Sequence, residues 1–156
     1  MNYWNEFLTV VADLLETESV QSMWNIKHHL YLSCFEHSVF VAYISYCTAR
    51  RLGRDSTAAA RAGLLHDFYL YDSHAGFQLK HYFTHASCAL ENAREICELS
   101  QVEENIILAH MWPFSAALPK SGEAFIVCLC DKYCAMVEGL HIWHHMKIRR
   151  RIPAAC

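Results

Sequence analysis

Six histidines and aspartates stand where the apolar faces of predicted helices should otherwise continue. The clearest case is LLHDFYLYD, residues 64–72, in which His66 and Asp67 lie side by side among large apolar residues. A buried carboxylate without a partner costs several kcal/mol, so such an aspartate needs a cation, a proton or hydrogen-bond donors. The six residues, each expected on the buried side of its helix, are His37, His66, Asp67, His85, His110 and Asp131.

Metal binding is the chemistry that this mixture of residue types indicates. Imidazole nitrogens and carboxylate oxygens together suit iron, manganese, cobalt, nickel or zinc. Six such ligands exceed the number that one tetrahedral ion needs, which favours two ions sharing a bridging carboxylate. Taken singly, each histidine is more commonly a hydrogen-bonded core residue. A purely structural helical bundle is therefore the alternative.

These residues can meet only if several helices pack around them, and the sequence predicts such helices. Apolar residues recur at helical spacing, and only three prolines and five glycines interrupt the chain. Gly53 is a natural end for one helix, and Asp55 or Ser56 can cap the next. We expect helices over residues 2–16, 19–27 with Ser19 as N-cap, 34–52, about 55–66, 84–99 with Thr84 as N-cap, 100–111 and 123–146.

The segments between these helices are expected to be loops, at residues 71–83 and in WPFSAALPKSG, residues 112–122. FIVCLC, residues 125–130, could form a short β run, but its continuation favours a helix. We find no internal repeat and no composition shift that would mark a second domain. The prediction is an all-α fold, in which residues 1–156 form a single-domain bundle of about six to eight helices.

Composition argues against several classes of protein. Hydrophobic residues make up 54% of the chain and charged residues 19%, which is typical of a globular protein and not of a disordered one. A net charge of −3 gives no general attraction to nucleic acid, and no apolar run reaches the roughly 18–20 residues of a membrane span. The N-terminal stretch lacks the basic region of a secretory signal. Eight cysteines without a C-x-x-C pair then favour free thiols in a reducing cytoplasm.

The order and context of the six residues resemble those of the HD-domain metal-dependent phosphohydrolases. FEHSVFVAYISYCTARRLG carries the first histidine, ARAGLLHDFYLYD the doublet and CLCDKYCAMVE the distal aspartate. The resemblance covers about residues 29–138, with N-terminal helices in 1–28 and a C-terminal helix and basic tail in 139–156. FTHASCALENA and IILAHMWPF resemble the two-metal branch of this superfamily, which includes bacterial hydrolases that split diadenosine tetraphosphate symmetrically.

The resemblance implies two divalent transition-metal ions that share one carboxylate. The number of ligands favours iron or manganese, while zinc, nickel, cobalt and magnesium are further candidates. The family pattern places one ion among His37, His66, Asp67 and Asp131, and a second ion among Asp67, His85 and His110.

Further residues are expected to act on the substrate or on water. The resemblance implies that an upstream basic residue contacts the substrate phosphate, and His29 is the candidate. Lys132, directly after the distal aspartate, could reach a phosphate oxygen or lie solvated on its helix. Asp72 could activate water, cap the loop or hold a ligand histidine. His74 and His81 fall in the predicted loop beside the doublet, where they could form a lid or contact phosphate.

We therefore expect a metal-dependent phosphohydrolase, in which a metal-activated hydroxide attacks the phosphorus of a nucleotide or another small phosphate ester or anhydride. The alternative is a catalytically silent module that senses a metal or a nucleotide. The expected partner is a small phosphorylated substrate, with neither nucleic acid nor a membrane involved. A monomer or a homodimer is expected.

Overall fold

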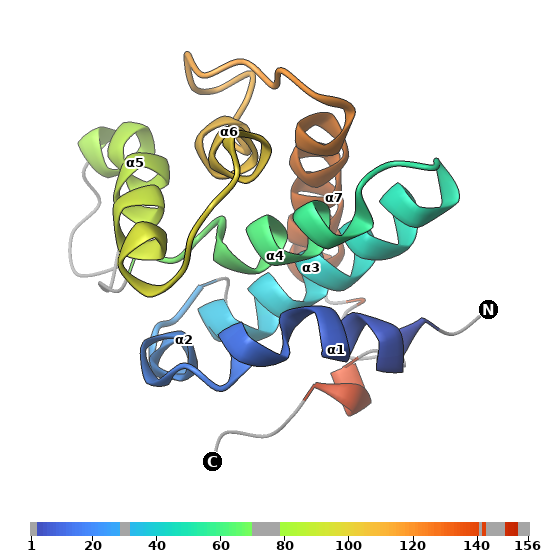
Figure 1. Ribbon diagram of the computed structural model, residues 1–156. Helices are drawn as coiled ribbons and strands as arrows, with labels where there is room; N and C mark the ends of the chain where they lie inside the picture. Colours follow the sequence, from blue (N-terminus) through green and yellow to red (C-terminus); the bar gives the residue numbers. More distant parts are fainter. Residues whose placement is uncertain (1–2, 29–31, 70–78, 141, 143–148, 153–156) are drawn as a thin grey trace.

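Seven α-helices and two short 3-10 helices make up most of the part of the chain that the structure describes (Figure 1), in agreement with the predicted all-α fold. This computed structural model describes residues 3–28, 32–69, 79–140, 142 and 149–152, without the side chains of 79–83 and 149. The helices are α1 (Trp4–Leu15), α2 (Glu18–Ser22), η1 (Met23–Asn25), α3 (Cys34–Arg51), α4 (Ser56–Leu65), α5 (Leu79–Ile96), α6 (Gln101–Ala109), α7 (Gly122–Gly139) and η4 (Arg149–Arg151).

Polar side chains cap the starts of three of the helices that carry the site. Ser33 precedes α3 and forms a capping box with Glu36, in which each side chain bonds the backbone N–H of the other residue. Ser100 and Glu103 form the same arrangement at the start of α6. Asp55 caps α4 by accepting a hydrogen bond from a backbone N–H of its first turn. The boundaries of α1, α3, α4 and α6 lie within two residues of the predicted ones.

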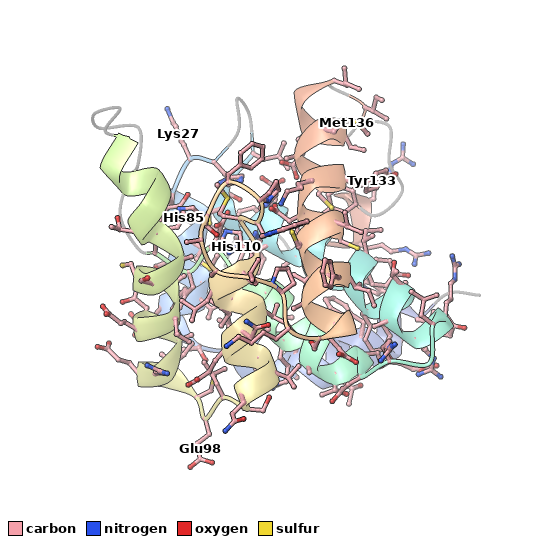
Figure 2. The ribbon with its side chains drawn as sticks, turned by 90° about the horizontal axis from the view of Figure 1, so that it is seen from above. Lys27, His85, Glu98, His110, Tyr133 and Met136 are labelled. Atoms are coloured by element: carbon pink, nitrogen blue, oxygen red, sulfur yellow. The ribbon has the colours of Figure 1, made fainter. Side chains whose placement is uncertain are left out.

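The helices α3 and α4 pack against each other through the middle of the molecule. In Figure 1, α1 and α2 lie on one side of this pair and α5, α6 and α7 lie on the other. A cluster of buried apolar side chains runs through all of these layers, and Phe7, Phe35, Phe40, Leu64 and Ile106 are among its fully buried members. α6 lies between α5 and α7 (Figure 2), α3 contacts both α4 and α7, and α4 contacts α6, so the helices around the six residues pack against one another.

Two helix boundaries differ from the predicted ones. α5 begins at Leu79, so the prediction of a loop as far as residue 83 was wrong, as was the N-cap at Thr84. The physical reason is visible in LKHYF, residues 79–83, whose apolar residues continue the helical spacing of α5 toward its start. α7 ends at Gly139 and not near residue 146, because glycine favours a helix end.

The short second helix also starts at a different residue. Thr17 and not Ser19 occupies its N-cap position, and residues 23–25 continue as a 3-10 turn. No helix among the described ranges has both the length and the apolar character needed to cross a bilayer. The cysteines of these ranges are free thiols.

The close packing of α3 against α4 depends on a glycine. A Cβ atom added at Gly63 would lie 3.1 Å from the Cα atom of Ala42, which is main chain in a packed helix and has little room to move. We expect Gly63→Ala to lower the free energy of unfolding by about 1–3 kcal/mol, because overpacking outweighs the gain of about 1 kcal/mol in helix propensity. Urea denaturation followed by circular dichroism measures this difference.

The matched control is Gly139→Ala, since a Cβ atom there would meet nothing within 4 Å. That variant should be as stable as the wild type or more stable by up to about 1 kcal/mol. Equal effects of the two substitutions would show that the close approach of α3 and α4 at Gly63 does not limit which side chain is tolerated there.

Candidate metal centre

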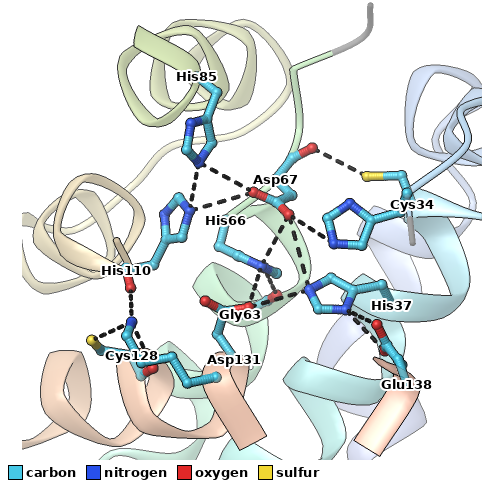
Figure 3. Close-up of polar contacts among 12 residues, drawn as sticks. Cys34, His37, Gly63, His66, Asp67, His85, His110, Cys128, Asp131 and Glu138 are labelled. Atoms are coloured by element: carbon cyan, nitrogen blue, oxygen red, sulfur yellow. Dashed lines mark hydrogen bonds and ion pairs between the residues drawn. The ribbon is translucent and has the colours of Figure 1, made fainter. Parts of the chain in front are cut away.

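The carboxylate of Asp67 lies among five histidines, two of them beside Oδ1 and three beside Oδ2 (Figure 3). Its Oδ1 is 3.4 Å from Nε2 of His110 and 3.7 Å from Nε2 of His85. Its Oδ2 is 3.5 Å from Nε2 of His66 and 3.9 Å from Nε2 of His37. We call these two halves of the site the Oδ1 side and the Oδ2 side.

A second carboxylate, from α7, completes the Oδ2 side. The Oδ1 atom of Asp131 is 3.3 Å from Nε2 of His37 and 3.6 Å from Nε2 of His66. The side chains of both histidines are fully buried, and that of Asp131 is 13% exposed. Residues from α3, from the end of α4 and from α7 thus point their polar atoms at one place, as the sequence predicted.

Two of the histidines are held by the ends of the helices that precede them. His66 directly follows α4, and its Nδ1 donates a hydrogen bond to the carbonyl of Gly63 at 2.8 Å. His110 directly follows α6, and its Nδ1 donates to the carbonyl of Ile107 at 2.7 Å. Because a carbonyl oxygen can only accept a hydrogen bond, each Nδ1 carries the hydrogen. Nε2 of each ring is then the nitrogen available as a metal ligand, and it faces the carboxylate of Asp67.

A third histidine is held by a carboxylate behind it. The Nδ1 atom of His37 lies 2.9 and 3.0 Å from the two carboxylate oxygens of Glu138, and both side chains are fully buried. A carboxylate in this position fixes the ring and makes Nε2 a better ligand, as it does behind metal-bound histidines in general. α7 therefore contributes Asp131 in front of His37 and Glu138 behind it.

The set of donors fits divalent cations. Nε2 of His66 is buried and has no hydrogen-bond partner within the described part of the chain. Nε2 of His85 and Nε2 of His110 are 3.0 Å apart, which requires either a shared hydrogen or a shared cation between the rings. Donors that bind one ion at about 2.1 Å lie about 3–3.4 Å apart, close to the separations seen on both sides of Asp67. These groups could hold a metal ion on each side.

The pKa values of the pocket follow from its buried carboxylates and imidazoles. Burial by itself lowers the pKa of His37, but the carboxylates of Glu138 and Asp131 outweigh it and raise that pKa to about 10. Burial by itself raises the pKa of Asp67 and of Asp131, but the neighbouring histidines outweigh it and hold both pKa values well below the usual range. At neutral pH the metal-free pocket therefore pairs ionised carboxylates with a protonated His37.

A family model of the HD domain matches residues 34–136, about two thirds of the chain. The chain belongs to the HD-domain family. Members of this family are mostly metal-dependent hydrolases, and the matched range includes all six residues that the sequence singled out. No curated protein and no solved structure matches the chain.

Two residues of the HD-domain pocket were not singled out from the sequence, and both lie outside the matched range. Glu138 follows Asp131 by seven residues, which is two helical turns, so the helical period could have placed both on one face of α7. His28 approaches Asp67 with its Nε2 3.6 Å from Oδ2. The neighbouring His29 was selected from the sequence instead, because two adjacent histidines give no indication of which side chain points toward the site.

Several other predicted site residues are not placed by the structure. His29, Asp72 and His74 lie outside the described residues. His81 belongs to α5, but its side chain is not described. The substrate and water-activating roles of these four residues stay predictions.

Lys132 lies beside the site and joins two of its helices. Its Nζ donates to the carbonyl of His110 at 2.9 Å and to the carbonyl of Cys128 at 3.3 Å. The ammonium group therefore stabilises the end of α6, where carbonyls lack partners within the helix. Its predicted contact with a substrate phosphate stays a prediction.

The raised pKa of His37 gives metal binding a pH dependence. In the metal-free HD domain this imidazole keeps its second proton up to about pH 10, and a cation can bind Nε2 only after that proton leaves. We expect the dissociation constant for Mn²⁺ to fall about tenfold for each pH unit between pH 6 and 8.5, because binding of the ion displaces one proton from His37. Calorimetric titrations across this pH range measure the dissociation constant, and repeating them in two buffers with different ionisation enthalpies gives the number of protons released.

Glu138→Gln serves as the control for this pH dependence. The amide still accepts a hydrogen bond but lacks the negative charge that raises the pKa of His37, so the slope above pH 7 should become shallower. An unchanged slope would show that another group loses the proton.

Proposed function

We propose that this chain is a metal-dependent phosphohydrolase that uses two divalent ions to hydrolyse a nucleotide or another small phosphate ester or anhydride. The observation that supports this most strongly is the position of Asp67, whose two oxygens lie beside two separate groups of imidazole nitrogens. A carboxylate in such a position is what a pair of ions about 3.5–4 Å apart requires as a bridge.

Each protein group has a distinct part in this proposal. When bound, the two ions would supply an activated water and would neutralise charge on the phosphoryl oxygens. Asp67 would hold both positions at a fixed separation, and Asp131 would anchor the Oδ2 side to α7. Glu138 would keep the ring of His37 in the orientation that presents Nε2. Burial of His66 and His37 would exclude bulk water from the Oδ2 side.

The donor types also limit the choice of ion. Four imidazoles and two carboxylates are a mixed nitrogen and oxygen set, which suits iron or manganese and suits magnesium less, since magnesium prefers oxygen ligands. We propose iron or manganese as the working metal. The two-metal branch of the HD superfamily, with its dinucleotide tetraphosphate hydrolases, remains our proposal for the nearest activity.

Turnover by the metal-loaded protein tests the proposal. Protein reconstituted with Mn²⁺, and separately with Fe²⁺ in the absence of air, is given an aryl phosphate, nucleoside mono-, di- and triphosphates and a dinucleotide tetraphosphate. We expect release of phosphate or of a nucleotide from at least one of them, and none after chelation. Metal binding at two positions without turnover of any compound would instead favour the silent sensor module.

A further inference from the structure

His28 lies beside the Oδ2 side of the site, and contacts on its backbone and its ring hold it there. It precedes α3, and its backbone N–H donates to the carbonyl of Leu32 at 3.0 Å beside a β-bridge between Lys27 and Ser33. Its Nδ1 lies 3.4 Å from the hydroxyl of Tyr69, and its side chain is 12% exposed. The orientation of the ring is therefore set by the backbone hydrogen bond of His28 and by the contact of its Nδ1 with Tyr69.

The distance from His28 to Asp67 matches those of the other histidines. Its Nε2 is 3.6 Å from Oδ2, whereas the corresponding distances for His66 and His37 are 3.5 and 3.9 Å. The ring of His28 also lies against the ring of His37 in a tilted arrangement, with centroids 4.1 Å apart and an angle of 33° between the planes. Two adjacent imidazoles whose Nε2 atoms lie beside the same carboxylate oxygen are arranged as two donors to one cation would be.

We propose that His28 is an additional ligand of the ion on the Oδ2 side, which makes the two metal positions unequal. This inference depends on the proposed metal ions but not on hydrolysis. The Oδ2 side then has five protein donors and the Oδ1 side has three. The five are His28, His37, His66, Asp67 and Asp131, and the three are Asp67, His85 and His110.

Unequal donor numbers predict different behaviour of the two ions. An ion with five protein donors has almost no open position and dissociates with difficulty, whereas an ion with three keeps positions for water and substrate oxygens. The Oδ2 side should therefore load first and release its metal last. The Oδ1 side should exchange its metal and receive the substrate phosphate.

Metal retention in His28→Ala tests this assignment without relying on turnover. Wild type and variant are loaded with Mn²⁺ and then titrated with a chelator, and the manganese that remains bound is counted at each step. The wild type should give two steps, one ion each. His28→Ala should weaken the tighter step by at least tenfold and leave the weaker step unchanged. Lys27→Ala, an exposed neighbour on the same segment, should match the wild type.

A second variant covers the case in which His28→Ala disturbs the segment before α3. Tyr69→Phe removes only the hydroxyl beside Nδ1 of His28, and it should weaken the tighter step by a smaller factor. Unchanged retention in His28→Ala, or equal weakening of both steps, would overturn the assignment. A wild type that binds no manganese would overturn it together with the proposed function. A wild type that binds two ions and hydrolyses nothing would overturn only the proposed function.

Discussion

Asp67→Ala should empty both metal positions at once. Asp67 has one carboxylate oxygen within 4 Å of histidines on each side, so its removal would take a ligand from both proposed ions. We expect about two ions per chain in the wild type and close to none in the variant. Turnover should fall by more than about 10³-fold, since the ions supply several kcal/mol of transition-state stabilisation. Elemental analysis and phosphate release measure the two effects.

An exposed aspartate provides the control for this experiment. Asp13 is 61% exposed and pairs with Arg61 at the surface, so Asp13→Ala should cost about 0–1 kcal/mol of stability and no metal. Circular dichroism of Asp67→Ala should retain the helical signal, which separates loss of metal from loss of fold. Equal metal content in Asp67→Ala and the wild type would contradict the whole assignment.

Asp131→Ala and His110→Ala should each empty a different position. Asp131 lies beside the histidines of the Oδ2 side, and His110 lies beside Oδ1 of Asp67. We expect each variant to keep about one ion per chain, with turnover lowered by roughly 10²–10³-fold because the remaining ion cannot act alone.

Spectroscopy can identify which ion is left in each of these variants. Loaded with Co²⁺, the wild type should show two coordination environments, and each variant should lose a different one of them. If the same environment disappears from both, the division of the ligands between two sides of Asp67 is wrong.

Much of this site could be predicted from the sequence because helices impose a period on their buried faces. Polar residues that interrupt such a face, as His37 does in α3, must find partners inside the molecule. The adjacent His66 and Asp67 are the strongest of these signals. Asp55, one of the two candidates from the sequence for the cap of α4, starts the helix that leads into His66 and Asp67.

The parts that could not be predicted depend on packing between distant segments. The helical period places Glu138 on the same face of α7 as Asp131. An acidic residue near a helix end is more commonly solvated, however, so its burial behind His37 was not predicted. His28 lies in an irregular segment, where no period says which side chain turns inward. The start of α5 before Thr84 was missed because polar residues nearby resemble those of a loop.

Two helices end at the candidate metal centre, and their ends add to its negative charge. α4 and α6 finish directly before His66 and His110, so their carbonyl termini bring partial negative charge to the same place as the carboxylates of Asp67 and Asp131. This negative charge disfavours an anionic ligand such as the phosphate of the proposed substrate. We therefore expect metal to bind before phosphate.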